Sequence, residues 1–326
     1  MICLGIESTA HTFGIGIMDD KKKLYANVKR LYTTQEGGLV PAKIAEHHVQ
    51  VCGDVIQEAL KISHLLLSDI DLVSFSASPG IGNCLRIGLQ AARALALIHN
   101  KPLVGVNHCI AHLEIGRALT KATDPVLLYA SGANTQVIAF ESGKYRIFGE
   151  TLDLGVGNFL DAFARDLGLG FPGGPQVEKI ALQSQNFIQL PYVVKGMDMS
   201  FSGLFTNLRQ KVASQKFSKE DLCFSVQETV FAMLCEVTER ALAHCSKHEV
   251  VLGGGVACNK RLQEMANQMC NARGAQCYFP ENQFLVDNGA MIAWLGILEY
   301  QAGVQHDAKS VSVHPYLRTD QVEVIW

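Results

Sequence analysis

Two histidines, His108 and His112, stand four residues apart where a strand-like run gives way to a helix-like one. On an α-helix this spacing puts both imidazoles on one face, which suits two ligands of a single metal ion. The alternative is that both are ordinary surface or core residues of a helix. A zinc protease of the H-E-x-x-H type would need Glu directly after the first histidine, and this chain has Cys109 there. The pair therefore indicates a metal site and argues against protease chemistry.

Three glycine-rich turns are candidates for nucleotide contacts: Gly253–Gly254–Gly255, Ser131–Thr135 and Pro79–Gly82. The first lies between an expected strand and a helix that carries Asn259, where glycine lets backbone N–H groups approach a ligand closely. Each turn taken alone could be purely structural. The chain has no G-x-x-x-x-G-K-[ST] and no G-x-S-x-G motif, which excludes a P-loop and a serine-hydrolase elbow.

The elements that must position these residues occur twice in the same order. Three strands are expected at residues 2–6, 13–18 and 24–31, and alternating helices and strands follow, with a helix opened by Pro41 and another capped by Asn107. The second half repeats this βββαβαβα order from Val126 onward. Its helical region is longer and is broken at Gly173–Gly174–Pro175.

Two such units form the architecture of actin, hexokinase and the Hsp70 ATPase. The sequence therefore predicts an α/β protein of the actin-like, sugar-kinase and Hsp70 ATPase (ASKHA) fold, with two duplicated RNase H-like lobes and an interlobe cleft. We expect the first lobe at residues 1–124 and the second, with inserted helices, at 125–326, its last segment free to return to the first lobe. Ligands of open α/β layers bind beyond the carboxyl ends of the strands.

The repeat adds two candidate metal ligands. The turn that matches Asn107–His108 in the second half contains Asp287–Asn288, so we expect Asp287 to face the same cleft from the other lobe. Tyr129, on the strand that opens the second half, is a candidate fourth ligand. Nitrogen and hard oxygen ligands together suit iron or zinc better than magnesium, and a phenolate favours iron. The alternatives are that Tyr129 is a half-buried aromatic residue of a strand and that Asp287 is a helix cap.

Composition indicates the class of protein and its cellular location. The 326 residues are 48% hydrophobic and 18% charged, which is typical of a globular protein, and no apolar run is long enough to span a bilayer. Ten scattered cysteines without a C-x-x-C pair, and an N-terminus without a basic leader, predict a cytoplasmic protein. The net charge of −3 is low for a protein that grips RNA alone, so an RNA substrate would need other chains for much of its phosphate contact.

Six segments resemble the signatures of one family, the tRNA N6-adenosine threonylcarbamoyltransferases, and specifically the archaeal and eukaryotic catalytic subunit of the KEOPS complex. The resemblance covers essentially the whole chain, in order. The segments are Val106–His112, Gly157–Asp161, Pro172–Pro175 with Glu178, Met197–Leu204, Gly253–Asn259 and Asp287–Met291.

The resemblance implies a role for each matching residue. It implies one metal ion per subunit, with Fe²⁺ favoured and Zn²⁺ as the alternative, and a site that holds threonylcarbamoyl-AMP; no catalytic base is implied beyond the metal site. The implied metal ligands are His108, His112, Tyr129 and Asp287, and the implied adenylate contacts are Tyr129, Ala130, Ser131, Gly132, Ala133, Asp161, Gly174, Glu178 and Asn259. Relatives commonly have Gly where this chain has Ala133, which puts the contacts of that turn in doubt.

The implied reaction is a metal-assisted transfer of the threonylcarbamoyl group to N6 of the adenosine next to the anticodon, in tRNAs that read ANN codons, with release of AMP. The implied partners are tRNA, other KEOPS subunits and a small protein kinase, to which some archaeal relatives are fused after the position of Trp326; no membrane is involved. Two alternatives stay open. A small-molecule kinase or ATPase of the same fold would leave the histidine pair without a purpose, and a non-catalytic nucleotide-binding scaffold would need no metal.

Overall fold

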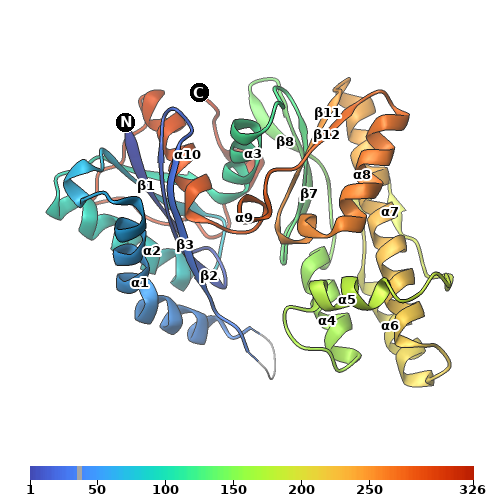
Figure 1. Cartoon of the computed structure of the whole chain (residues 1–326). Helices are drawn as coiled ribbons and strands as arrows, with labels where there is room; N and C mark the ends of the chain where they lie inside the picture. Colours follow the sequence, from blue (N-terminus) through green and yellow to red (C-terminus); the bar gives the residue numbers. More distant parts are fainter. Residues whose placement is uncertain (35–38) are drawn as a thin grey trace. The chain divides into compact units, whose positions relative to one another are not determined.

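The chain forms two compact units (Figure 1). The computed structural model describes residues 1–34 and 39–326. Unit 1 consists of Met1–Leu119, Gly143–Tyr145 and Asp287–Trp326, and unit 2 of Thr120–Ser142 and Arg146–Val286. The last forty residues thus belong to the same unit as the first strand, as the expectation of a returning last segment allowed.

The sheet of unit 1 has the strand order β3-β2-β1-β4-β5. Strands β1 and β2, and β2 and β3, pair antiparallel, whereas β4 runs parallel to β1 and to β5. The strands are β1 (Ile2–Glu7), β2 (Thr12–Asp19), β3 (Leu24–Leu31), β4 (Leu72–Ser78) and β5 (Leu103–Asn107). Because β1, β4 and β5 are parallel, their carboxyl ends, which carry Glu7, Ser78 and Asn107, lie at one edge of the sheet.

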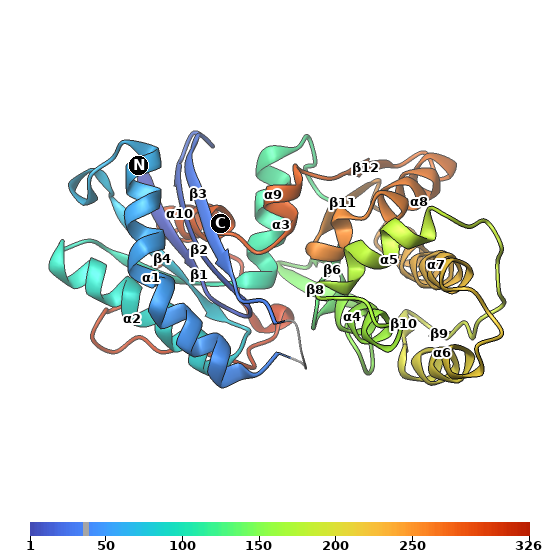
Figure 2. The ribbon, with the colours of Figure 1, turned by 60° about the horizontal axis from the view of Figure 1, so that its bottom comes forward.

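Helices cover both faces of this sheet (Figure 2). Alternate residues such as Leu4 and Ile6 form a core with Val55 and Leu89 of the helices α1 and α2. On the other face α10 packs so closely that a Cβ added to Gly5 would lie 2.2 Å from the backbone nitrogen of Ala293. The helices of unit 1 are α1 (Pro41–Ser63), α2 (Gly82–Ile98), α3 (His108–Leu119) and α10 (Gly289–Gln301), with short 3₁₀ turns at η1 (Leu67–Asp69) and η3 (Thr319–Gln321).

The main sheet of unit 2 repeats the topology of unit 1, with the order β12-β11-β6-β7-β8. Its first two strands, β6 and β7, pair antiparallel, and β11 runs parallel to β6 and to β12, so the predicted repeat is confirmed in strand order and direction. The strands are β6 (Val126–Ala130), β7 (Thr135–Glu141), β8 (Lys144–Glu150), β11 (Glu249–Gly253) and β12 (Gln276–Tyr278), and a separate small ribbon consists of β9 (Val194–Lys195) and β10 (Asp198–Met199).

The helices of unit 2 surround a core built on one face of that sheet. The helical region is broken between α4 and α5 as expected, and the Gly173–Gly174–Pro175 segment opens the second of these helices, since proline is tolerated in a first turn where its missing N–H needs no partner. The helix that follows the small ribbon was not expected from the sequence. The helices are α4 (Val156–Asp166), α5 (Gly173–Ala181), α6 (Ser202–Ser214), α7 (Lys219–Cys245), α8 (Lys260–Ala272) and α9 (Asn282–Leu285), with a 3₁₀ turn at η2 (Gly255–Cys258).

The last helix, α10, follows the second repeat in sequence, but it belongs to unit 1 and packs against β1, β2 and β4, as a returning last segment would. The physical reason is its surface: small residues at its start fit against glycines of the first sheet, and a Cβ on Gly16 would lie 2.0 Å from the nitrogen of Ala290. Among the described residues, no helix combines the length and apolar character needed to cross a bilayer.

Candidate metal centre and nucleotide-binding segments

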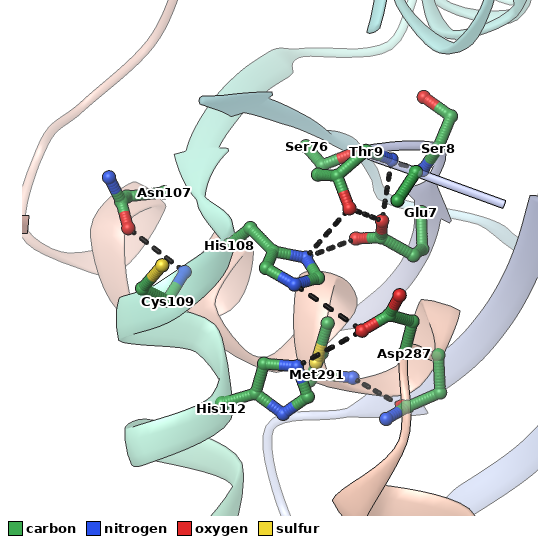
Figure 3. Close-up of polar contacts among 12 residues, drawn as sticks. Glu7, Ser8, Thr9, Ser76, Asn107, His108, Cys109, His112, Asp287 and Met291 are labelled. Atoms are coloured by element: carbon green, nitrogen blue, oxygen red, sulfur yellow. Dashed lines mark hydrogen bonds and ion pairs between the residues drawn. The ribbon is translucent and has the colours of Figure 1, made fainter. Parts of the chain in front are cut away.

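Helix α3 brings the two histidines together at the carboxyl edge of the first sheet (Figure 3). Asn107 ends β5 and caps the helix, because its Oδ1 accepts hydrogen bonds from the backbone N–H groups of Cys109 (3.0 Å) and Ile110 (3.2 Å). His108 and His112 then lie one turn apart, both buried, with ring centroids 4.8 Å apart. The predicted cap and the predicted common face are both confirmed.

Asp287 reaches both imidazoles from the segment that leads into α10. Its Oδ1 lies 3.4 Å from Nε2 of His108 and 3.4 Å from Nε2 of His112. The next residue, Asn288, is the cap of α10 and accepts a hydrogen bond from the N–H of Met291 at 3.0 Å, which fixes the backbone beside the carboxylate. Asp287 belongs to unit 1, like the two histidines, so the expectation that it comes from the other lobe is wrong.

Burial and charge set the protonation of this cluster. Burial lowers the pKa of His112, which keeps the imidazole neutral at pH 7. For Asp287, burial opposes ionisation, but the positive charge and hydrogen bonding of His108, joined by His112, outweigh it and hold the pKa of the carboxyl well below its usual range. Neutral imidazole and ionised carboxylate are the forms that bind metals.

These three residues fit a transition-metal ion. One ligand atom from each of His108, His112 and Asp287 lies within 4.8 Å of the others, and within the described ranges no other trio of His, Cys, Asp or Glu meets this condition. Two imidazole nitrogens and one carboxylate oxygen suit iron or zinc, and a three-residue set leaves coordination positions open for further ligands. The donor chemistry therefore agrees with a catalytic rather than a closed structural site.

Two residues behind His108 were not foreseen from the sequence. Glu7 is completely buried, and its Oε2 lies 2.8 Å from Nδ1 of His108. Thr9 donates to Oε1 of the same carboxylate from its backbone N–H (2.7 Å) and its hydroxyl (2.5 Å). The available signal was a lone acidic residue at the end of an apolar strand, which has meaning only once the strand is known to end beside α3.

The segments expected to contact the adenylate are all in unit 2. Tyr129 and Ala130 are the last residues of β6, and Tyr129 is buried on the face opposite to the core formed by Leu128 and Ala130. Ser131 to Asn134 form the expected hairpin turn, closed by a hydrogen bond of 2.9 Å from the N–H of Ser131 to the carbonyl of Asn134.

The hairpin turn packs on the start of α4 and accommodates alanine. The N–H groups of Gly157 and Asn158 donate to the carbonyls of Ser131 and Gly132 at 3.0 and 2.9 Å. Ala133 is not among the residues with positive φ, so its methyl group needs no strained backbone conformation. Alanine at position 133 is therefore compatible with the turn.

The triglycine turn lies against the same strand. Gly254 has φ +89°, and a Cβ there would lie 2.3 Å from the carbonyl oxygen of Ala130. Asn259 follows and caps α8 by accepting from the N–H groups of Arg261 (2.8 Å) and Leu262 (3.2 Å). The close approach of Gly254 to Ala130 explains why glycine is required in the turn. The cap by Asn259 explains the start of α8.

Asp161, Gly174 and Glu178, the remaining residues expected to contact the adenylate, lie on α5 or contact it. Glu178 accepts a hydrogen bond of 2.8 Å from the N–H of Lys260, directly after Asn259. Asp161 on α4 accepts one of 2.7 Å from the N–H of Gly173 at the start of α5, and Gly174 has open space where a Cβ would stand. Unit 2 therefore presents helix starts and glycine backbone beside two carboxylates, a combination able to hold a nucleotide.

Comparison with solved structures supports the fold. HypF of T. kodakarensis superposes with a TM-score of 0.66 at 15% identity, over 92% of this chain and 48% of HypF. The component A of (R)-2-hydroxyglutaryl-CoA dehydratase from Acidaminococcus fermentans gives a TM-score of 0.55 at 17% identity, over 90% and 97% of the two chains. At such low identity the likeness shows the fold alone, and it confirms the ASKHA type.

Sequence comparison shows the family. The family model for tRNA N6-adenosine threonylcarbamoyltransferase (TsaD) matches residues 23–294. The protein of that name from Thermococcus kodakarensis is 53% identical over the full length of both chains, and that of Methanocella arvoryzae is 50% identical over 99% of this chain and 98% of the relative. A relative from Methanothermobacter thermautotrophicus, named a probable bifunctional tRNA threonylcarbamoyladenosine biosynthesis protein, is 50% identical over all of this chain and 61% of its own length. The chain thus belongs to the tRNA N6-adenosine threonylcarbamoyltransferase family.

Proposed function

We propose that this protein transfers the threonylcarbamoyl group from threonylcarbamoyl-AMP to N6 of the adenosine next to the anticodon, in tRNAs that read ANN codons. The observation that carries the proposal is the match to relatives of this name, at 53% identity over the full length of both chains. The buried cluster of His108, His112 and Asp287 supports it, because a sugar kinase or a scaffold has no use for such a ligand set.

The chemistry is an acyl transfer between two bound substrates. The exocyclic amine of adenine attacks the carbamoyl carbon, a new C–N bond forms, the C–O bond to the phosphate breaks, AMP leaves and the amine loses a proton. A metal ion bound by His108, His112 and Asp287 would supply electrostatic stabilisation of charge on the acyl oxygen or the departing phosphate. The chain's own residues bind and orient the substrates, and no protein nucleophile is required.

The metal in this proposal is Fe²⁺, with Zn²⁺ as the alternative. Two imidazoles and a carboxylate are a common ligand set for ferrous iron, and they also bind zinc. Tyr129 as a further ligand remains a prediction, and a phenolate would strengthen the case for iron. The adenylate contacts proposed for unit 2 are those named from the family resemblance, from the hairpin turn after Tyr129 to Asn259.

The proposed partners follow from the relatives. Some relatives are named bifunctional biosynthesis proteins, and this chain covers about three fifths of their length, which supports an additional protein partner. We infer that this partner is the small kinase of the KEOPS complex, acting with the other KEOPS subunits. The ten cysteines are all free thiols, which supports the proposed cytoplasmic location.

The decisive experiment replaces one histidine ligand. His108→Ala should abolish transfer to tRNA, with a loss on the order of a hundredfold or more, because electrostatic stabilisation is often worth several kcal/mol of barrier. AMP binding should be retained, since the proposed adenylate contacts are carried by the other unit. The assay supplies threonylcarbamoyl-AMP, tRNA and the accessory subunits, and mass spectrometry quantifies the modified nucleoside.

His244→Ala, on the exposed side of α7, is the matched control and should leave transfer unchanged. Near-wild-type product from folded His108→Ala would contradict the role of the metal site. A wild-type protein that phosphorylates sugars and forms no modified nucleoside would overturn the proposed function.

A further inference from the structure

The carboxylate of Glu7 is an acceptor for three hydrogen-bond donors at the end of β1 (Figure 3). Its Oε1 accepts from both the N–H and the hydroxyl of Thr9, at 2.7 and 2.5 Å, and its Oε2 is left for Nδ1 of His108 at 2.8 Å. Glu7 has no exposed surface, so water cannot replace any of these donors. Each carboxylate oxygen thus faces one partner residue, and the Thr9 hydroxyl also lies 3.3 Å from Nδ1 of His108.

This arrangement determines which nitrogen of His108 can bind a metal. A neutral imidazole carries its proton on one nitrogen and a lone pair on the other. With Nδ1–H donating to Glu7, the proton that His108 gives up on binding a metal is the one on Nε2, which in the metal-free protein faces Asp287 at 3.4 Å. A histidine held in the other tautomer would present a proton where the ligand lone pair is needed.

Thr9 is itself held in place by the turn between β4 and α2. The N–H of Ile81 donates to the carbonyl of Thr9 at 2.8 Å, and the N–H of Gly80 donates to the carbonyl of Pro315 at 3.1 Å. A Cβ on Gly80 would lie 2.7 Å from the carbonyl oxygen of Thr9 and 2.9 Å from its Cβ. The Pro79–Gly82 turn, which the sequence suggested as a nucleotide contact, therefore packs directly on Thr9 and can do so only with glycine.

We propose that Glu7 and Thr9 are positioning residues of the metal centre, which fix the Nε2-coordinating tautomer of His108, and that Gly80 permits the close packing that holds Thr9. The inference rests on the proposed metal site and adds three residues on two further segments to it. None of the three belongs to the ligand group of His108, His112 and Asp287 or to the proposed adenylate contacts. They act through His108.

The first test is the metal affinity of Glu7→Gln. Glutamine offers one acceptor oxygen instead of two, so its amide N–H groups must face either Thr9 or Nδ1 of His108, where donors already stand. We expect Zn²⁺ and Co²⁺ to bind about 10- to 100-fold more weakly, as for other partners of metal-bound histidines. Competition with a chromophoric chelator measures the affinity on the full-length, metal-stripped protein, and the visible spectrum of bound Co²⁺ should change as well.

A matched control removes a buried hydroxyl from the same sheet without touching this chain of contacts. Ser74→Ala loses the hydrogen bond of 2.8 Å from its hydroxyl to the carbonyl of Ile292 on α10. Its metal affinity and Co²⁺ spectrum should match those of the wild type. Wild-type metal affinity and spectrum in folded Glu7→Gln would overturn the proposal.

Two milder substitutions keep the test valid if Glu7→Gln fails to fold. Thr9→Val keeps the shape of the side chain and removes the hydroxyl donor, whereas Thr9→Ser keeps the donor. We expect about tenfold weaker metal binding for Thr9→Val and near-wild-type binding for Thr9→Ser. Equal affinities in the two variants would overturn the role of Thr9. Gly80→Ala should weaken metal binding as Thr9→Val does, and wild-type affinity would overturn the role of the turn.

The readouts separate this proposal from the proposed function. If the wild type binds metal but forms no modified tRNA nucleoside, the transferase assignment fails while the positioning role can still be measured. If folded Glu7→Gln retains both metal affinity and transfer, only the positioning role fails.

Discussion

Two buried carboxyl groups of unit 1 have pKa values shifted in opposite directions, because their neighbours differ. Asp287 stays ionised because His108 and His112 face its carboxylate, and the positive charge of His108 has the largest favourable effect. Glu299, on the helix α10 that follows Asp287, is 6% exposed, and burial alone raises its pKa to about 8. The histidines keep the carboxylate of Asp287 in the ionised form that binds metals, whereas Glu299, without such neighbours, holds its proton.

Because His108, His112 and Asp287 each supply one ligand atom, replacing any of them should lower the bound metal by a similar amount. Asp287→Ala should lower bound metal about as much as His112→Ala, because each removes one donor from a three-residue site. Elemental analysis of purified variants measures the content. Asp287→Asn, which keeps the shape but not the charge, should fall between Asp287→Ala and the wild type. Full metal content in Asp287→Ala would exclude the carboxylate as a ligand.

The raised pKa of Glu299 predicts that the stability of the protein depends on pH. Its folded-state pKa, about 8, is above the ordinary value of 4.5, so the folded state holds the proton more tightly than the unfolded state does. The associated stability is present below pH 4.5 and is lost as pH rises through about 8. Glu299→Gln should therefore become more stable than the wild type at pH 9, by on the order of a few kcal/mol.

Urea unfolding at pH 5 and pH 9 measures this difference. The variant and the wild type should be similar at pH 5, where the folded wild type carries a neutral Glu299. A stability difference that does not change between the two pH values would show that Glu299 does not titrate with a raised pKa. Other titrating groups cancel in the comparison because both proteins contain them.

At the scale of elements, glycine determines how closely helices and turns approach the sheets. Gly5 and Gly16 on the first sheet lie against the backbone of α10, and Gly254 lies against the end of β6. The first contact brings the segment that carries Asp287 to the sheet that carries Glu7. The second brings the turn before Asn259 to the strand that carries Tyr129. In both units, the functional residues stand next to a contact that any Cβ would prevent.

Gly254→Ala should be strongly destabilising. The substitution forces a side chain into a positive φ of +89° and places its Cβ 2.3 Å from the carbonyl oxygen of Ala130. Backbone strain and overpacking together predict a loss of about 3 kcal/mol or more in the free energy of unfolding. Urea denaturation followed by circular dichroism measures it.

Gly203→Ala is the control for this change. Gly203 is an exposed position of α6 in the same unit, and no atom lies within 4 Å of the place that an alanine methyl group would occupy. Alanine should therefore change stability there by less than about 1 kcal/mol. Equal effects of the two substitutions would show that the contact with Ala130 does not limit the turn.

At the scale of the whole molecule, charge bears on how the protein meets its RNA substrate. The chain carries 28 Lys and Arg against 31 Asp and Glu, a net charge of −3. Several of its arginines are engaged by carboxylates within the chain, as Arg261 is by Glu228 and Arg273 by Glu239. Electrostatic contact with phosphates supplies most non-specific affinity for nucleic acid, so this chain is poorly equipped to hold tRNA alone.

The isolated chain should therefore bind tRNA weakly, and tight binding should need the larger assembly. Fluorescence titration with labelled tRNA at near-physiological salt, with and without the accessory subunits, measures the difference. Because few phosphate contacts are expected, the affinity of the isolated chain should also depend only weakly on salt. Submicromolar affinity of the chain alone would contradict this view of its charge.

Local patterns were sufficient to predict most elements and the histidine pair. The alternation of strands, the proline that opens α1, the cap Asn107 and the helix starts at Ser218 and Asn288 depend on residues a few positions apart, and they appear in the structure where expected. The same is true of His108 and His112, because helical geometry fixes residues four apart. Helix α6 was missed, and it starts after Phe201, which makes no side-chain cap, so the local signal for a helix start is absent.

Long-range packing decided the rest. Asp287 is 175 residues from His112 in sequence, and its place in unit 1 depends on α10 fitting against Gly5 and Gly16. Glu7 and Thr9 gain their meaning only because β1 and β5 run parallel to β4, so that their carboxyl ends lie at one edge. Sequence by itself determined the ligand types and the local helix that presents two of them. Tertiary structure decided which distant residues complete the site, because side-chain contact across a sheet depends on strand order and on backbone approach, and neither is encoded in the spacing of neighbouring residues.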